Sequence, residues 1–242
     1  ATGAERTVML GLRTIEWVRE ADAFGPAFAL RVNGVPVQAR GANTVPPDFF
    51  TARAEGGWDA LVRVAAAAHM NTLRVWGGGG YPPEAFYAAC DREGVLVWQD
   101  FAFACAMVPG SEAFRENVAA EAAEQVRRVR HHPCLALWCG NNEVELAWER
   151  WNWQEIYGLH GADSAAVAAD YAAVFDTLLP GIVAAESAAA YWPSSPHAKG
   201  DEHAWGVWFG REDFTYYSRH EGRFASEYGL QSLPDRHTLR EA

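Results

Sequence analysis

The stretch Leu135-Ala136-Leu137-Trp138-Cys139-Gly140-Asn141-Asn142-Glu143 joins an apolar run to a carboxylate that directly follows two amides. The apolar part of this stretch, 135–138, predicts a strand. A second carboxylate, Glu227, ends another short strand-like segment, Arg223-Phe224-Ala225-Ser226-Glu227. A glycosidase needs two glutamates placed in this way, one to donate a proton and one to attack. The pair therefore predicts a glycosidase site at the strand ends.

Strand-like and helix-like segments alternate on both sides of this stretch. Helices are predicted at 58–70, from Pro82 to Gly94, from a Ser111 cap to Arg130, and at 164–179, where Pro180-Gly181 ends the run. Strands are predicted at 37–41, 71–76, 95–98, 135–139, 188–192, 203–208 and 223–226. This alternation implies a parallel sheet, and about seven such units favour a (β/α)8 barrel of the TIM type over an open sheet.

The two ends of the chain differ from this pattern. Residues 7–18 and 27–32 alternate as strands do, and Asn33-Gly34 is a strong hairpin signal. Residues 238–242 are too short to supply a helix and another strand. We therefore expect an α/β barrel that is truncated before its eighth strand and preceded by a short N-terminal β segment.

Composition argues against several classes of function. With 242 residues, 50% of them hydrophobic, the chain can bury a sizeable core. Its net charge of −11 argues against nucleic-acid binding, and the basic run at 127–132 is typical of a solvated helix end. No segment approaches the roughly 20 apolar residues of a membrane span, so no membrane partner is expected.

The cysteines and histidines show no metal-ligand spacing. The four cysteines are Cys90, Cys105, Cys134 and Cys139. None forms a CxxC pair, and all four are interpreted as buried thiols. His131-His132 before Pro133 is interpreted as a helix-to-strand turn rather than a metal site. Without a signal-peptide pattern or a disulfide pattern, a cytoplasmic location is favoured, and the sequence leaves the oligomeric state open.

In a barrel of this type the active-site groups lie at the carboxyl ends of the strands. The candidate strands from the second to the seventh end at or near Arg74 and Trp76, Gln99 and Asp100, Asn142 and Glu143, Trp192, His203 and Trp205, and Glu227. The glycines at 77–80 lack the lysine of a phosphate loop, so they predict a loop that lets a ligand approach the backbone closely. Glu145 competes with Glu143 for the role of the acid, and Glu143 is favoured because it lies nearer the strand end.

The placement of the tryptophans also favours a sugar site. The chain has 11 tryptophans, of which Trp17 and Trp58 are predicted to lie in the core. Trp76, Trp151 and Trp205 fall in loops or at strand ends. We expect these three rings to stack on the C–H faces of sugar rings.

Five motifs together identify a family resemblance. They are Gly41-Ala42-Asn43 with Pro46, Arg74-Val75-Trp76-Gly77-Gly78-Gly79, Trp98-Gln99-Asp100-Phe101, Trp138-Cys139-Gly140-Asn141-Asn142-Glu143, and Ser226-Glu227-Tyr228-Gly229. With these motifs the chain resembles the β-mannosidases of glycoside hydrolase family 2, from about residue 5 onward. The resemblance implies a barrel fold, a retaining mechanism and a β-mannoside substrate, with no cofactor or metal.

The resemblance also implies a role for each motif. Glu143 would be the general acid/base and Glu227 the nucleophile, with Arg74 beside Glu227 and Asn142 bound to the sugar 2-hydroxyl. The sugar-contacting positions would be Trp76, Asp100, Trp151, His203 and Trp205. The charge of Arg74 is expected to keep Glu227 ionised, and tryptophans around Glu143 are expected to raise its pKa by desolvation.

Full-length members of this family carry sandwich domains before the barrel and further domains after it. Residues 1–33 resemble the end of such a β-sandwich domain and the entry to the barrel, and residues 34–242 resemble the catalytic barrel. Phe209 stands where a histidine would be common. Two alternatives stay open. One is another family 2 glycosidase, such as an exo-β-glucosaminidase or an endo-β-mannosidase, and the other is a fragment that binds sugar without turnover.

Overall fold

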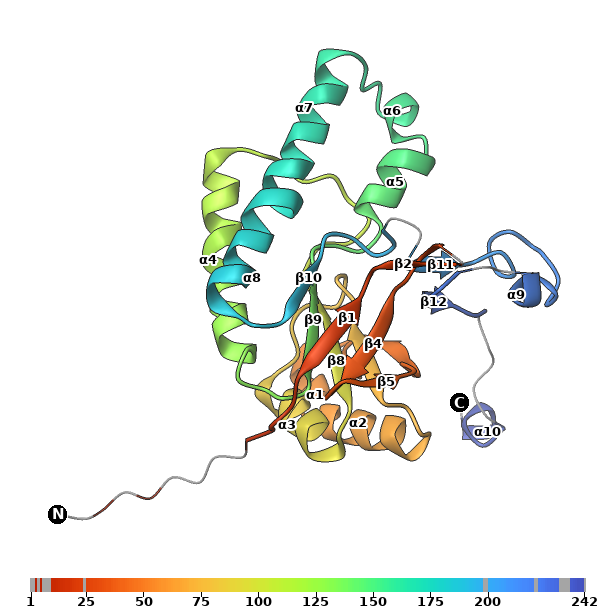
Figure 1. Ribbon diagram of the computed structural model, residues 1–242. Coiled ribbons are helices and arrows are strands. Elements are labelled where there is room, and N and C mark those ends of the chain that lie inside the picture. Colours follow the sequence, from red (N-terminus) through yellow and green to blue (C-terminus); the bar gives the residue numbers. More distant parts are fainter. Residues whose placement is uncertain are drawn as a thin grey trace.

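The computed structural model describes residues 3, 5, 10–23, 25–197, 200–219, 222–230 and 236–241. Five parallel strands form its main sheet, in the order β10-β9-β8-β7-β6 (Figure 1). They are β6 (Gly41–Thr44), β7 (Thr72–Val75), β8 (Leu96–Asp100), β9 (Leu135–Cys139) and β10 (Ala190–Trp192). Each strand pairs in parallel with the one before it in the sequence. The alternation of strands and helices predicted this arrangement.

Two further strands, β11 (Glu202–Ala204) and β12 (Ala225–Tyr228), form a separate parallel pair. β12 lies beside β6, because the side-chain amide of Asn43 donates to the carbonyl of Ser226 at 3.0 Å. The strand predicted at 203–208 is shorter than expected, since a turn occupies 206–209, and Glu227 lies within β12 rather than after it. The structure thus confirms a parallel α/β sheet, and the closed barrel stays a prediction.

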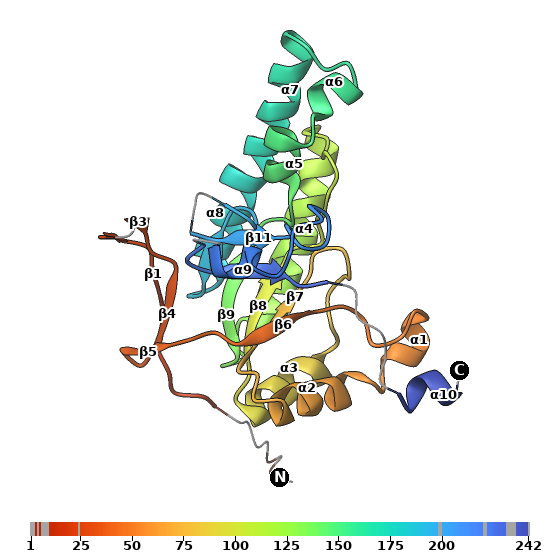
Figure 2. The ribbon, with the colours of Figure 1, turned by 90° about the vertical axis from the view of Figure 1, so that its right-hand side faces the viewer.

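Helices follow most strands of the main sheet. They are α1 (Thr51–Ala54), α2 (Trp58–Ala67), α3 (Glu84–Glu93), α4 (Glu112–Val129), α5 (Val144–Arg150), α6 (Trp153–Ile156), α7 (Ala162–Tyr171), the π-helical segment η1 (Ala172–Leu178), α8 (Leu179–Glu186), α9 (Tyr216–Arg219) and α10 (Thr238–Glu241). In both ribbon views α5, α6 and α7 project beyond one end of the sheet, away from α2 and α3 (Figures 1 and 2).

Local chemistry accounts for the ends of two helices. The hydroxyl of Ser111 accepts a hydrogen bond from the backbone N–H of Phe114 and so caps the first turn of α4. α3 ends at Gly94, whose φ of 71° lies in the left-handed region that glycine adopts without strain. Both boundaries predicted from the sequence are confirmed.

The prediction that Pro180-Gly181 ends a helix is wrong. The helix runs without a break from α7 through η1 into α8 and ends at Glu186. Pro180 is the second residue of α8, directly after the π-helical segment, so its missing N–H falls where the hydrogen-bond register changes. Among the described residues this run, 162–186, is the one helix long and apolar enough to cross a membrane by length and composition, contrary to the sequence expectation. Its buried residues pack it against α4 and β10.

Two hydrophobic cores lie on opposite faces of the main sheet. Along β8, Val97 belongs to the core under the helices and Trp98 to the other core, as strand alternation requires. The second core is covered by an antiparallel sheet of β1 (Ile15–Val18), β4 (Ala29–Val32) and β5 (Val35–Val37). Trp17 of β1 donates its indole N–H to the carbonyl of Ala136 at 3.0 Å, and its ring lies 4.8 Å from that of Phe28. The prediction that Trp17 and Trp58 are core residues is confirmed.

The hairpin predicted at Asn33-Gly34 is confirmed, since it joins β4 and β5 with Val32 opposite Val35. Because β5 uses Val35–Val37, the strand predicted at 37–41 begins only at Gly41. The antiparallel sheet therefore extends past the expected border at residue 33. A short antiparallel pair, β2 (Ala21–Asp22) with β3 (Gly25–Pro26), adds to this region, and residues 7–9 of the first predicted strand lie outside the described residues.

His132 links α3 to the entry of β9 through two carboxylates. Its Nδ1 atom lies 2.5 Å from Asp91 and its Nε2 atom 2.8 Å from Glu84. Burial lowers the pKa of His132, but the hydrogen bonds to Asp91 and Glu84 outweigh it, so the pKa is raised. The turn predicted at 131–132 thus also carries an ion pair, His132 with Asp91 and Glu84, that joins α3 to the segment leading into β9.

This ion pair predicts a pH-dependent stability. His132 in the unfolded chain has a pKa of about 6.5, and its folded pKa is higher, so the pair stabilises the fold fully below about pH 6.5. The stabilisation is lost as the pH rises through the folded pKa. The difference in unfolding free energy between the wild type and His132→Gln, measured in urea, should therefore shrink as the pH is raised above about 6.5. A constant difference would contradict a charged His132.

Docking of the N-terminal sheet can be tested at Trp17. Trp17→Ala removes a buried ring and its hydrogen bond to Ala136, so the unfolding free energy should fall by about 3–5 kcal/mol. Phe49→Ala, at a ring that is 94% exposed, is the matched control and should change it by less than about 0.5 kcal/mol. Equal small effects of the two substitutions would show that β1 does not pack on the main sheet in solution.

Candidate active site

Arg74, on β7, is the centre of the polar cluster at the strand ends. It is 4% exposed, and its guanidinium donates to Asp100 from Nε at 3.3 Å and from Nη2 at 2.8 Å. Nη1 donates to Glu227 at 2.8 Å and to Asn43 at 3.1 Å, and Nη2 donates to Asn142 at 2.8 Å. All five N–H donors of the guanidinium therefore have partners. The predicted contact between Arg74 and Glu227 is confirmed.

The structure brings Glu143 and Glu227 together around His203. His203 Nδ1 lies 2.7 Å from Glu143 Oε1 and 3.3 Å from Glu227 Oε2, and its side chain is 1% exposed. One ligand atom from each of these three residues lies within 4.8 Å of the others. Trp205 completes the surroundings of Glu227 by donating its indole N–H to Oε2 at 3.0 Å. The two glutamates thus share one buried site, although 84 residues separate them in the sequence (227 − 143 = 84).

Backbone geometry places Glu143 at the start of α5. Its φ is 60°, in the left-handed region that a residue other than glycine seldom adopts. Its N–H donates to the carbonyl of Ser195 at 2.8 Å, which ties the end of β9 to the loop after β10. A non-glycine residue held in this conformation stores strain that the surrounding contacts must offset, and such residues cluster at functional sites.

The electrostatics of Glu143 differ from the sequence expectation. Burial does raise the pKa of Glu143, but a hydrogen bond from His203, the charge of His203 and a hydrogen bond from Cys105 outweigh it, so the pKa is lowered. The expectation that tryptophan walls raise this pKa is therefore wrong. For Arg74, burial lowers the pKa, and the charges of Asp100 and Glu227 outweigh this effect and raise it.

Asp100 holds Arg74 rather than facing open space. Its carboxylate is 1% exposed and accepts hydrogen bonds from Arg74, from the indole N–H of Trp98 at 2.8 Å and from the backbone N–H of Gly77 at 3.1 Å. With its oxygens occupied by these donors, Asp100 has no free face for a sugar. We therefore assign Asp100 a positioning role in place of the sugar contact expected from the sequence.

The glycine run after β7 has a packing reason. A Cβ on Gly77 would lie 2.4 Å from the carbonyl oxygen of Phe103, and a Cβ on Gly78 would lie 2.0 Å from the ring of Trp76. The absence of side chains at 77 and 78 thus lets Gly77 reach Asp100 and lets the Trp76 ring fold over the loop. Trp76 is half-buried there, at the end of β7.

Trp151 lies apart from the two glutamates. It follows α5, is 39% exposed and meets the ring of Trp153 edge-on at 6.1 Å. Within the part of the chain that the structure describes, no hydrogen bond or ring contact joins Trp151 to the cluster around Arg74. The structure therefore brings together the predicted site residues Arg74, Asp100, Asn142, Glu143, His203, Trp205 and Glu227. It leaves Trp151 on the projecting helices, and no hydrogen bond or ring contact joins Trp76 to the cluster among the described residues.

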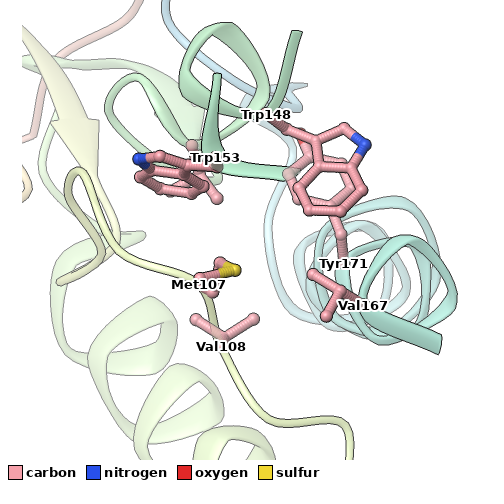
Figure 3. Close-up of a pocket in the computed structure, with 7 residues that line it drawn as sticks. Met107, Val108, Trp148, Trp153, Val167 and Tyr171 are labelled. Carbon is pink, nitrogen blue, oxygen red and sulfur yellow. The ribbon is translucent and has the colours of Figure 1, made fainter. Parts of the chain in front are cut away.

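An apolar pocket lies between those projecting helices and the loop after β8. It is lined by Met107, Val108, Val144, Trp148, Trp153, Val167 and Tyr171. In Figure 3 the rings of Trp148 and Trp153 lie above Met107 and Val108. Val144 directly follows Glu143, so the pocket adjoins the site through the first turn of α5.

Sequence reasoning missed several members of the cluster. Asn43 binds Arg74 and Ser226, and only its place in the motif 41–43 could have indicated it. Cys105 was predicted to be buried, and that prediction is wrong, because its thiol is exposed at the site and lies 3.5 Å from Glu143. Burial and the charge of Glu143 raise the pKa of Cys105 to about 11. Ser195 is the third missed residue, with Oγ 3.1 Å from His203 Nε2.

Three groups in the described part of the chain have ligand atoms spaced as a metal site would need. They are Glu84 with His131 and His132, Asp91 with His132 and Cys134, and Glu143 with His203 and Glu227. In each group the histidine already lies within 3.5 Å of a carboxylate oxygen. The third group also has the charge of Arg74 beside Glu227, which disfavours a second cation there.

No protein-family model matches the chain. Among curated relatives, β-mannosidase B of Emericella nidulans is 35% identical over 243 residues, which covers 95% of this chain and 29% of that protein. The β-mannosidase of Rattus norvegicus is 33% identical over 257 residues, with 98% and 29% covered. The crystal structure of β-D-mannosidase from Dictyoglomus thermophilum matches with a TM-score of 0.85 at 38% identity, covering 96% of this chain and 29% of that one.

These similarities relate the chain to the β-mannosidases, which are glycoside hydrolases and which it matches over nearly all of its own length. The chain spans 29% of the length of these relatives.

The role of Arg74 can be tested through stability. Arg74→Met leaves Asp100 and Glu227 buried without their counter-charge, so the unfolding free energy should fall by about 3–5 kcal/mol. Adding Asp100→Asn, which removes one of the two unpaired charges, should recover part of the loss.

The control is Arg63→Ala, at an exposed pair with Asp59, which should cost less than about 1 kcal/mol in urea unfolding. A similarly small effect of Arg74→Met would show that the five-donor cluster is absent in solution.

Proposed function

We propose that the chain carries the catalytic site of a retaining, exo-acting β-mannosidase, which removes terminal non-reducing β-D-mannose residues from β-mannosides. The observation that carries this proposal is the approach of Glu143 and Glu227 to within 4.8 Å around His203. Retaining glycosidases place their two carboxyl groups roughly 5–5.5 Å apart, and inverting enzymes about 6.5–9.5 Å apart. The homology to proteins named β-mannosidase supports the choice of sugar.

The proposal includes the closed architecture. β6 to β10 would be five strands of a (β/α)8 barrel, with β11 and β12 as the sixth and seventh. The contact between Asn43 and Ser226, which brings β12 beside β6, supports this closure. The antiparallel sheet that ends with β5 would then belong to a β-sandwich domain, and the residues from β6 onward would belong to the catalytic barrel.

In the first step Glu227 attacks the anomeric carbon while Glu143 protonates the leaving oxygen. The bond between the anomeric carbon and the leaving oxygen breaks, and a mannosyl ester of Glu227 forms. In the second step Glu143 takes a proton from water, and the water oxygen displaces Glu227 to release mannose. These steps use no cofactor or metal.

Arg74, Asn142 and Trp205 would assist the nucleophile and the sugar. Arg74 and the indole N–H of Trp205 bond one oxygen each of Glu227, which fixes the carboxylate for attack. Arg74 also holds the amide oxygen of Asn142, so that the amide group is oriented for a sugar 2-hydroxyl. Trp76 lies at the end of β7, where its ring could stack on the sugar.

The alternatives differ in measurable ways. Another family 2 glycosidase, such as an exo-β-glucosaminidase or an endo-β-mannosidase, would prefer a different aryl glycoside or an internal linkage. A chain that binds sugar without turnover would show mannose binding by calorimetry and no hydrolysis. A panel of aryl glycosides, run beside the calorimetry, decides between these outcomes.

The two glutamates can be separated by chemistry. Glu143→Ala should harm substrates with poor leaving groups most, because activated aryl mannosides need little protonation to depart. Azide should then rescue the activated substrate and give a β-mannosyl azide, by attacking the covalent intermediate from the vacated side. The loss on poor leaving groups should reach about 10²–10⁴-fold, which is the usual worth of general acid catalysis.

Glu227→Ala should abolish turnover on both kinds of substrate, and azide should give the α-mannosyl azide. Glu145→Ala is the matched control. Glu145 lies on α5, the helix that follows Glu143, and its carboxylate pairs with His197 at 2.6 Å. Equal losses on good and poor leaving groups for Glu143→Ala, without azide rescue, would reassign the acid to Glu145.

A further inference from the structure

A buried chain of polar groups lies behind His203. The Nε2 atom of His203 is 3.1 Å from Ser195 Oγ, which is 3.1 Å from Ser226 Oγ. The Ser226 hydroxyl donates to Asp201, which also accepts from the indole N–H of Trp192 at 3.2 Å. Asp201 is 1% exposed. A buried carboxylate is costly unless its partners satisfy it, so this fully paired chain fixes its members in place.

We propose that His203 holds the proton that Glu143 delivers to the leaving group, and that Asp201, Ser226 and Ser195 position His203 for this task. The inference rests on the proposed function, in which Glu143 is the general acid. It assigns to His203 a positioning role in place of the sugar contact expected from the sequence. It also gives the buried serines and Asp201 a part in the reaction.

The hydrogen bonds of this chain indicate how many protons the His203 ring carries. An ionised carboxylate only accepts hydrogen bonds, so the contact between Ser226 and Asp201 uses the one hydroxyl proton of Ser226. The contact between the two serines then uses the proton of Ser195. The contact between Ser195 and His203 therefore needs a proton on Nε2, and the contact with Glu143 needs one on Nδ1. All contacts are satisfied together when His203 is an imidazolium.

The two carboxylates that face the ring support the same count. At the far end of the chain the pKa of Asp201 is raised, because burial outweighs the hydrogen bond from Ser226 and the charges of His203 and Arg74, which lower it. On the other side of the ring, Glu143 and Glu227 are the carboxylates that face His203. A positive ring beside these two carboxylates is better stabilised than a neutral one.

A proton held on His203 would explain how Glu143 becomes protonated before the first step. The acid must be protonated before the first step, yet the hydrogen bond and charge of His203 help to lower the pKa of Glu143. In the proposed step the Nδ1 proton moves from His203 to Glu143 Oε1, two atoms that lie 2.7 Å apart. The imidazolium becomes a neutral imidazole and the carboxylate becomes a carboxylic acid. That proton then passes to the leaving oxygen as its bond to the anomeric carbon breaks.

Ser195→Ala tests this inference in the 242-residue chain. Losing the Ser195 hydroxyl disconnects His203 from Asp201, so His203 should give up its second proton more easily. We expect kcat on poor leaving groups to fall about 10- to 100-fold, within the 10²–10⁴ that general acid catalysis supplies. Activated aryl mannosides should lose less than about 3-fold, and the alkaline limb of the kcat/KM profile should move to lower pH.

The matched control is Ser194→Ala, which removes the neighbouring buried hydroxyl. Ser194 bonds Asn141 at 2.8 Å rather than His203. This variant should keep the wild-type pH profile and the wild-type ratio of rates on good and poor leaving groups. Ser195→Thr, which keeps a hydroxyl at the same position, should restore most of the alkaline limb.

A measurement without turnover separates this inference from the proposed function. The ring nitrogens of His203 can be observed by 15N NMR, with His203→Gln to identify their signals. Near neutral pH both should be protonated in the wild type, and one should be unprotonated in Ser195→Ala. A neutral His203 in the wild type, or a Ser195→Ala profile equal to that of Ser194→Ala, would overturn the inference. A doubly protonated His203 in a chain that hydrolyses no mannoside would confirm the role of the polar chain from His203 to Asp201 and reject the proposed function.

Discussion

The saturation of Arg74 is the constraint on which the rest of the site depends. One buried guanidinium uses its five donors to connect Asn43 on β6, Asp100 on β8, Asn142 after β9 and Glu227 on β12. Each partner comes from a different strand, so the positions of four strand ends are fixed relative to one charged group. Removing one partner of a buried ion pair lowers the free energy of unfolding by about 3–5 kcal/mol, because the other charge is left unpaired. The cluster therefore tolerates little displacement of any strand.

His203 imposes a second constraint on the same two glutamates from the opposite side. Arg74 bonds Glu227 alone, whereas the Nδ1 atom of His203 reaches both Glu143 and Glu227. Glu227 thus contacts Arg74, Trp205 and His203, and Glu143 lies between His203 and the thiol of Cys105. This asymmetry distinguishes the two carboxylates physically, with one fixed by a permanent cation and the other by a group that can give up its proton.

The packing of the sheet explains how such a polar cluster is supported. Helices cover one face, and the aromatic side chains of the N-terminal antiparallel sheet cover part of the other, with Trp17 and Phe28 against Trp98. The ring of Trp98 belongs to this second core, and its indole N–H donates to Asp100 of the charged site. Trp98 therefore joins the hydrophobic core to the charged site.

The sequence by itself determined the order of strands and helices, the hairpin at Asn33-Gly34, the caps at Ser111 and Gly94, and the two glutamates, because these follow from local periodicity and from motifs. It failed at Pro180, where a change of helical register absorbs the missing donor, and at Glu143, whose pKa depends on a histidine 60 residues away. Asn43, Cys105, Ser195 and the buried Asp201 could not be found in advance. Their roles come from contacts between distant strands, and hydrogen bonding is decided by distance in space rather than along the chain.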